Sequence, residues 1–285
     1  MIYKFKKEVL FMFICGAVSC GVILNVIYNP KVLAKEQDES FSVIMYHHIT
    51  DDDKKTGDYV ISEKQLKADF EYLYNNGYKT LSVRDLLAIE AGEIKLPEKS
   101  VMITFDDGQK SFYRYAFPLL KKYNFKAVFS IIGKQTEIYS SSEDDNINYA
   151  HVIYDEIKEM VSSGLVEIGN HSYDMHNNNG KRAGVTKAKG ESFQMYKKAL
   201  EEDIFKFNNL LMKNTGLETK IFTYPFGKFS KETEKIIKDN GFTVAFTCYE
   251  IKNVPKQNEN WLYRLGRYNR SGKYETENFF KKVLF

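Results

Sequence analysis

The chain has 285 residues, of which 43% are hydrophobic and 15% are aromatic, and its formal net charge is +3. That length and composition suffice to bury the core of one large domain or of two small ones. Residues 1–34 hold four lysines and one glutamate, and removing these from the 41 basic and 38 acidic residues leaves 37 of each sign. The rest of the chain therefore has no basic excess, which argues against nucleic acid as a partner.

The N-terminal segment has the pattern of an export signal. Lys4, Lys6 and Lys7 precede an uncharged, mostly apolar run, Val9–Tyr28. A helix of this length can cross a bilayer, and the preceding lysines predict that the remainder of the chain lies outside the cell. Val32-Leu33-Ala34 is also a small-residue cleavage pattern. We predict that residues 1–34 are a retained membrane anchor, which the long apolar run favours, or a signal peptide.

The three cysteines limit the chemistry of the exported part. Cys15 and Cys20 lie in the apolar run, which leaves Cys248 alone after residue 34. The exported part therefore has neither an internal disulfide nor a zinc site built from cysteines.

Strands and helices are predicted to alternate along the chain. After a polar link at 35–41, the expected order is strand 42–49, helices 63–76 and 83–90, strand 101–105, helix 111–123, strand 126–132, helix 155–163, strand 165–170, helix 191–212, strand 220–224, helix 231–240, strand 242–248 and helix 275–283. Ser62 and Ser82 are expected to cap the first two helices. The alternation and the continuous apolar strands indicate a parallel sheet, open or closed into a barrel. Residues 134–150 and 177–190 are polar and are expected to be surface loops over one end.

Two adjacent carboxylates, Asp106 and Asp107, follow the apolar strand at 101–105. Neighbouring carboxylates repel each other, and burying them without a partner costs free energy. Either both face water on an ordinary loop, or a positive group lies beside them.

Histidines lie at the ends of two other predicted strands. His47 and His48 end the first strand, and EIGNHSYDMH places His171 directly after a strand with His176 five residues later. The carboxyl ends of parallel strands share one face, so these groups are expected to meet the two aspartates. Two imidazoles and one carboxylate leave coordination positions open, as in catalytic metal sites. We predict a metal site in which one aspartate binds the cation and the other stays free as a base.

Two further segments are candidates for the same site. FTYPFG (222–227) contains a turn at a strand end that can present a backbone N–H to a ligand. LYRLGRYNR (262–270) carries three arginines, of which at least one is expected to lie at the solvated surface.

The motifs TFDDG (104–108), HSYDMH (171–176) and YPFG (224–227) occur in this order at strand ends. In this the chain resembles the polysaccharide deacetylases with a NodB homology domain, carbohydrate esterase family four, over roughly residues 41–270. The resemblance implies a distorted (β/α) barrel of about seven parallel strands. Here the barrel would be preceded by one N-terminal hydrophobic helix, with residues 35–285 as the deacetylase domain.

Within the family, the chain resembles most the branch that de-N-acetylates poly-β-1,6-N-acetylglucosamine, and two features carry this resemblance. The two motif histidines are five residues apart rather than four, and an MYHHI strand opens the domain. In that branch the acid histidine comes from this first strand. The resemblance therefore implies His47 as the acid, with His48 as the alternative, because strand alternation points the two in opposite directions.

Further roles are implied by matching positions to the family motifs. Asp106 would be the general base, and the backbone N–H of Phe226 would donate to the oxyanion. The metal ligands would be Asp107, His171 and His176.

The chain also departs from the family pattern. The arginine that usually stands two residues before the motif proline is Thr223 here, and Arg267 is a candidate to replace it. The usual late tryptophan motif is not evident, and Trp261 is no obvious substitute.

The resemblance implies metal-dependent hydrolysis of N-acetyl groups on an extracellular N-acetylglucosamine polymer. Zinc is the expected metal, with cobalt and nickel as alternatives. Poly-β-1,6-N-acetylglucosamine is favoured over peptidoglycan and chitin oligomers. Two other hypotheses stay open: a membrane-tethered glycan-binding protein without turnover, which the missing motif arginine supports, and an esterase that removes O-acetyl groups.

Overall fold

A computed structural model describes residues 39–178, 180 and 182–284. The predicted hydrophobic helix and cleavage pattern in residues 1–34 lie outside this range. Within it, no helix combines the length and the apolar character needed to span a membrane.

One parallel sheet forms the centre of the described chain. Its strands are β1 (Ser42–Tyr46), β4 (Lys79–Thr80), β5 (Ser100–Phe105), β6 (Ala127–Ile131), β7 (Val166–Asn170), β8 (Ile221–Thr223), β9 (Val244–Phe246) and β10 (Tyr268–Asn269). Their order is β10-β1-β5-β6-β7-β8-β9, and β4 pairs with the start of β5. Leu265 pairs with Phe246 of β9, whereas Tyr268 pairs with Ile44 of β1. The short segment 265–268 thus links β9, at one end of the strand order, to β1, next to the other end, and the sheet is the predicted distorted barrel with seven strands along its path.

The first predicted strand is wrong in its extent, because 42–49 is not continuous. β1 ends at Tyr46, and β2 (His48–Thr50) pairs with β3 (Val60–Ser62) in a separate two-stranded sheet. The backbone changes partners at His47: Asp106 donates its N–H to the Tyr46 carbonyl at 3.0 Å, whereas the His48 N–H donates to Tyr59 at 3.1 Å. The alternation rule for a single strand therefore does not relate His47 to His48.

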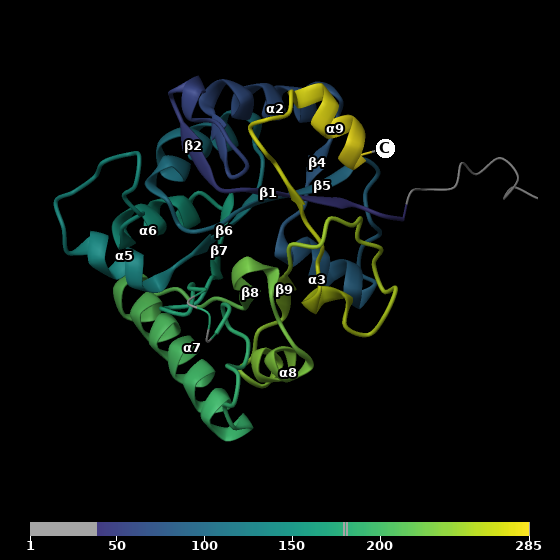
Figure 1. Cartoon of the computed structure of the whole chain (residues 1–285). Helices are drawn as coiled ribbons and strands as arrows, with labels where there is room; N and C mark the ends of the chain where they lie inside the picture. Colours follow the sequence, from purple (N-terminus) through teal and green to yellow (C-terminus); the bar gives the residue numbers. More distant parts are fainter. Residues whose placement is uncertain (1–38, 179, 181, 285) are drawn as a thin grey trace, which may run out of the picture. The chain divides into compact units, whose positions relative to one another are not determined.

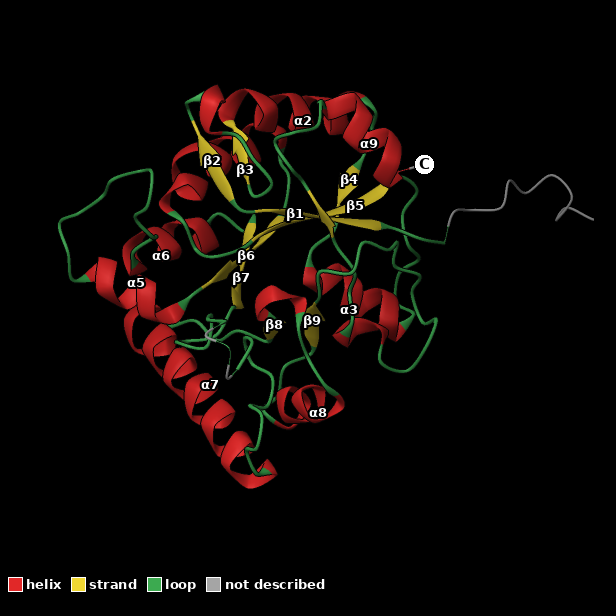
Figure 2. Ribbon diagram, viewed as in Figure 1, coloured by secondary structure: helices red, strands yellow, loops and turns green. Residues whose placement is uncertain are grey.

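Helices surround the strands (Figure 2). They are α2 (Glu63–Asn75), α3 (Val83–Ala91), α4 (Phe117–Tyr123), α5 (Gly133–Ser140), α6 (Tyr154–Ser162), α7 (Phe193–Thr215), α8 (Lys231–Asp239) and α9 (Thr276–Leu284). The predicted caps are confirmed, because Ser62 and Ser82 each form a capping box with the residue three positions later. The predicted helix 111–123 begins with a π-turn at Phe112–Ala116 before α4.

Both predicted surface loops contain ordered, partly buried structure. The first holds α5, whose Gly133 and Thr136 are buried. In the second, Val185 is fully buried between α7 and α8. Composition marks these stretches as polar but does not reveal the distant segments against which a few of their residues pack.

Both faces of the strands are buried, as their apolar runs predict. On one face Ile44, Ile103 and Phe129 pack with residues of α2, α4 and α6. Val43 and Met102 alternate with them and pack on the other face against α3. The carboxyl ends of β1, β5, β7 and β8 are thereby held at one end of the sheet.

Two of the three arginines in segment 262–270 are buried, and Arg264 is the partly exposed one. The Arg270 guanidinium donates to Asp69 of α2 at 2.7 and 3.0 Å, and the Thr276 hydroxyl at the start of α9 donates to the same carboxylate at 2.7 Å. α9 lies beside α2 (Figure 1), where Tyr72 stacks on Phe280 at 4.8 Å between ring centroids. This network fixes the end of β10, three residues after Arg267.

Candidate active site

The two neighbouring aspartates lie in different environments. Asp107 has a left-handed backbone, with φ of 71°, and Gly108 continues the turn with φ of 78°. Asp106 is only 3% exposed, whereas the Asp107 side chain is 23% exposed. A Cβ on Gly108 would come within 3.0 Å of Ile131, so the tight turn requires glycine. The turn after β5 thus lets the two carboxylates take different partners.

Asp107 lies with the two motif histidines. Its Oδ1 is 3.6 Å from His171 Nε2 and 3.5 Å from His176 Nε2, and one donor atom from each of the three residues lies within 4.8 Å of the others. His171 donates its Nδ1–H to the Thr223 carbonyl at 2.8 Å, which leaves the Nε2 lone pair free. Burial lowers the pKa of both imidazoles and so favours the neutral form that a metal ligand needs. This donor set fits a divalent metal ion.

Asp106 is paired with Arg267 instead. Arg267 Nη1 and Nη2 donate to the two Asp106 oxygens, each at 2.8 Å, and Arg267 Nε donates to the Thr247 carbonyl at 2.8 Å. Burial acts to raise the pKa of Asp106, but the charge of Arg267, then that of His171, and the Arg267 hydrogen bonds hold it well below its usual range. Asp106 is therefore a buried carboxylate with a fixed orientation.

Thr223 does not contribute a side chain to this pair. Its hydroxyl shares a hydrogen bond of 2.7 Å with Ser130, and its carbonyl accepts from His171. A guanidinium does reach the buried aspartate, but it comes from the segment before β10 rather than from the end of β8.

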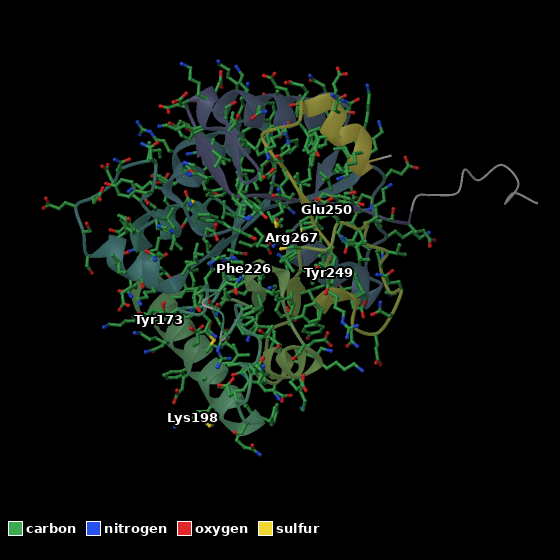
Figure 3. The ribbon with its side chains drawn as sticks, viewed as in Figure 1. Tyr173, Lys198, Phe226, Tyr249, Glu250 and Arg267 are labelled. Carbon is green, nitrogen blue, oxygen red and sulfur yellow. The ribbon has the colours of Figure 1, made fainter. Side chains whose placement is uncertain are left out.

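The Pro225–Gly227 turn after β8 borders the metal-type donor set. Phe226 has a left-handed backbone with φ of 59°, the residue is 43% exposed, and its ring centroid lies 4.6 Å from that of His176. No residue within the described range accepts a hydrogen bond from the Phe226 N–H. Figure 3 labels Phe226, in the turn after β8, and Arg267, which directly precedes β10. The turn thus offers a backbone N–H group, a hydrogen-bond donor, next to His176.

His47 and His48 have different neighbours. The His47 ring meets Tyr59 edge-on at 4.9 Å, and its charge acts to lower the pKa of both Asp106 and His176. His48 Nδ1 instead lies 3.1 Å from the Ser111 hydroxyl, and burial lowers its pKa. Of the two, His47 is therefore the histidine whose charge acts on Asp106 and on His176.

Asp203 was not singled out from the sequence. It lies on α7 and accepts hydrogen bonds from the backbone N–H groups of Tyr173 and Asp174, between the two motif histidines. The sequence signal that could have indicated Asp203 is its place on the apolar face of a helix, where it precedes the buried Ile204. Trp261, in contrast, is buried against α3 and donates to Glu90 at 2.6 Å.

The chain matches the polysaccharide deacetylase family model over residues 93–245, just over half its length. It is 26% identical over 256 residues to the poly-β-1,6-N-acetyl-D-glucosamine N-deacetylase of Staphylococcus aureus strain MRSA252, covering 85% of this chain and 84% of that protein.

Two solved structures are similar as well. The de-N-acetylase from Aggregatibacter actinomycetemcomitans is 27% identical with a TM-score of 0.72, and the match covers 84% of this chain and 99% of that one. IcaB from Ammonifex degensii is 27% identical with a TM-score of 0.70, and the match covers 87% of this chain and 97% of that one. The family match spans Asp106, Asp107, His171, His176 and the Pro225–Gly227 turn, and the chain belongs to the polysaccharide deacetylase family.

Proposed function

We propose that the protein removes N-acetyl groups from an extracellular N-acetylglucosamine polymer, with poly-β-1,6-N-acetylglucosamine as the favoured substrate. The observation that carries this proposal is the pair of separated aspartates: Asp107 lies with two imidazoles, while Asp106 stays ionised beside them. The Staphylococcus aureus relative is named for this polymer. Peptidoglycan and chitin oligomers are the alternative substrates.

Asp107, His171 and His176 would hold a divalent cation. Zinc is favoured, with cobalt and nickel as alternatives, because imidazole and carboxylate ligands suit all three. Such a cation supplies positive charge that polarises an amide carbonyl and lowers the pKa of water.

The chain's own residues would carry the proton transfers. Asp106, held by Arg267, would accept a proton from the water whose oxygen bonds to the acetyl carbon. The Phe226 N–H would donate to the developing oxyanion. His47 would then protonate the nitrogen as the C–N bond breaks. The products are acetate and a free amine that becomes cationic at neutral pH, which alters how the polymer adheres to anionic surfaces.

The non-catalytic alternative loses its main support. That hypothesis depended on the missing motif arginine at position 223, and Arg267 supplies a guanidinium to Asp106 from elsewhere. A binding protein has no evident need for an ionised aspartate beside a metal site. An O-acetyl esterase could use the same groups and has to be distinguished by substrate.

We also propose that residues 35–285 act outside the cell. The three lysines before the apolar run Val9–Tyr28 support this orientation. Residues 1–34 would keep the protein at the outer face of the membrane, or be removed to release it.

Metal-dependent acetate release is the test of this function. We expect the full chain to release acetate from β-1,6-linked N-acetylglucosamine oligomers, to lose that activity when stripped of metal, and to regain it with zinc, cobalt or nickel. Acetate and free amine should appear in equal amounts, because one C–N bond breaks for each acetate. Faster release from O-acetylated sugars would identify an esterase. No release from these oligomers, peptidoglycan or chitin oligomers would favour the binding protein.

The two neighbouring histidines provide a second prediction. His47→Ala is expected to lower kcat by roughly 10²-fold or more, the usual contribution of a general acid, whereas His48→Ala should lower it much less. The reason is that the charge of His47 acts to lower the pKa of Asp106, whereas the His48 ring forms a hydrogen bond with the Ser111 hydroxyl. Steady-state kinetics of both variants, with metal content measured, make the comparison. A larger loss in His48→Ala would move the acid role to that residue.

A further inference from the structure

The loop between the two motif histidines is held by helix α7. Asp203 lies within α7 and is 8% exposed, between the buried residues Leu200 and Phe207. A buried carboxylate costs free energy unless hydrogen bonds compensate it. Here the compensation comes from outside the helix: Oδ1 accepts the Tyr173 N–H at 2.7 Å, and Oδ2 accepts the Asp174 N–H at 2.8 Å.

Helix α5 and the loop itself supply the remaining hydrogen bonds. The N–H groups of Gly133 and Lys134, at the start of α5, donate to the carbonyls of Ser172 and Tyr173 at 3.0 and 2.9 Å. Ser172 is fully buried in a left-handed conformation, with φ of 69°, and its hydroxyl accepts the Met175 N–H at 3.1 Å. The loop is therefore held from two helices, with its N–H groups on α7 and its carbonyls on α5.

The side chain of Tyr173 attaches the same loop to both helices. Its hydroxyl donates to Glu137 of α5 at 2.6 Å, and the Lys206 ammonium of α7 lies 4.0 Å from its ring centroid. Figure 3 shows Tyr173 next to α7. These side-chain contacts are partly exposed, whereas Asp203 accepts hydrogen bonds from the backbone of the loop itself.

We propose that Asp203 is a positioning residue for the metal site. Its carboxylate fixes the backbone between His171 and His176, and therefore the spacing of these two histidines, before any metal binds. This inference rests on the proposed metal-binding role of the two histidines. Both oxygens are needed, because each accepts one of two consecutive N–H groups. Within the described range, both hydrogen bonds to this carboxylate come from the loop, so its removal acts on the spacing of the ligands.

The test is the metal affinity of Asp203→Asn in the full chain. Asparagine keeps the size but offers one acceptor oxygen, and its NH₂ group faces the second N–H. We expect Zn²⁺ affinity, measured by competition with a chromogenic chelator, to fall by roughly 10–100-fold, as for other groups that orient metal ligands. The visible absorption spectrum of the Co²⁺-loaded variant should also change, which a loss of fold stability alone would not cause.

A matched control is Glu234→Gln. Glu234 is a buried carboxylate on α8, 6% exposed, and its partners Arg264 and Lys238 lie outside the histidine loop. This variant should lower the unfolding temperature while keeping the wild-type Zn²⁺ affinity and Co²⁺ spectrum. Wild-type affinity in Asp203→Asn would overturn the inference and leave the proposed function standing. A wild-type chain that binds no metal would overturn both.

Amide exchange tests the same inference without a substitution, should Asp203→Asn not fold. In the metal-free wild-type chain, the Tyr173 and Asp174 N–H groups are expected to exchange slowly, because the carboxylate holds them already. Exchange at the rate of exposed amides without metal, and protection only after Zn²⁺ is added, would show that the metal organises the loop. That result would overturn the role of Asp203.

Discussion

Asp106→Asn is expected to lower turnover by roughly 10²–10⁴-fold, the contribution of a general base, while zinc stays bound. The amide cannot accept the proton of the attacking water. Metal binding should persist because the Asp106 oxygens bind Arg267, and Asp107 is the aspartate that lies with His171 and His176. Steady-state kinetics and the zinc content of the purified variant are the two measurements.

Asp107→Asn is the matched variant, because it makes the same chemical change one residue along the chain. It should lose both zinc and activity. The opposite pattern, with a metal-free Asp106→Asn chain and zinc retained in Asp107→Asn, would show that the two roles are exchanged. Because Arg267 loses its counter-charge in Asp106→Asn, the unfolding curve should be recorded with the kinetics.

Arg267→Met is expected to destabilise the fold by about 3–5 kcal/mol, because it leaves the buried Asp106 charge without its partner. Turnover should also fall sharply. Without the guanidinium, burial raises the pKa of Asp106, and the carboxylate loses the two hydrogen bonds that orient it. Denaturant unfolding and kcat of the folded fraction measure the two effects separately.

Arg267→Lys distinguishes charge from geometry at this position. Lysine keeps the positive charge but cannot make the two parallel hydrogen bonds of the guanidinium. If orientation of Asp106 matters, Arg267→Lys should recover much of the stability but little of kcat. Arg264→Gln is the control within the same segment, since Arg264 pairs with Glu234 and is partly exposed. Wild-type kcat in a folded Arg267→Met chain would contradict the proposed role.

The sequence pattern predicts a parallel sheet and a site made of two histidines and one of two adjacent aspartates, whereas the barrel and the choice of Asp107 as the ligand come from the family resemblance. Apolar runs at regular intervals predict parallel strands, and the carboxyl ends of such strands share one face. Asp107 and His171 each follow a strand closely, so local sequence fixes where they emerge, whereas His176 lies at the far end of a loop. The closeness of their donor atoms follows from the sheet that those strands form.

Tertiary structure decided the partners of these groups. Arg267 is 161 positions from Asp106, and its segment showed only three arginines without a periodic pattern, so no local rule could pair it with the aspartate. The strand breaks at His47 because β5 pairs with the backbone up to Tyr46, whereas β3 pairs with it from His48 onwards. Asp203 likewise bonds to the loop between His171 and His176 from α7, a helix that begins later in the chain than this loop. Strand positions follow from local hydrophobic patterns, whereas hydrogen-bond partners depend on which distant segments pack together.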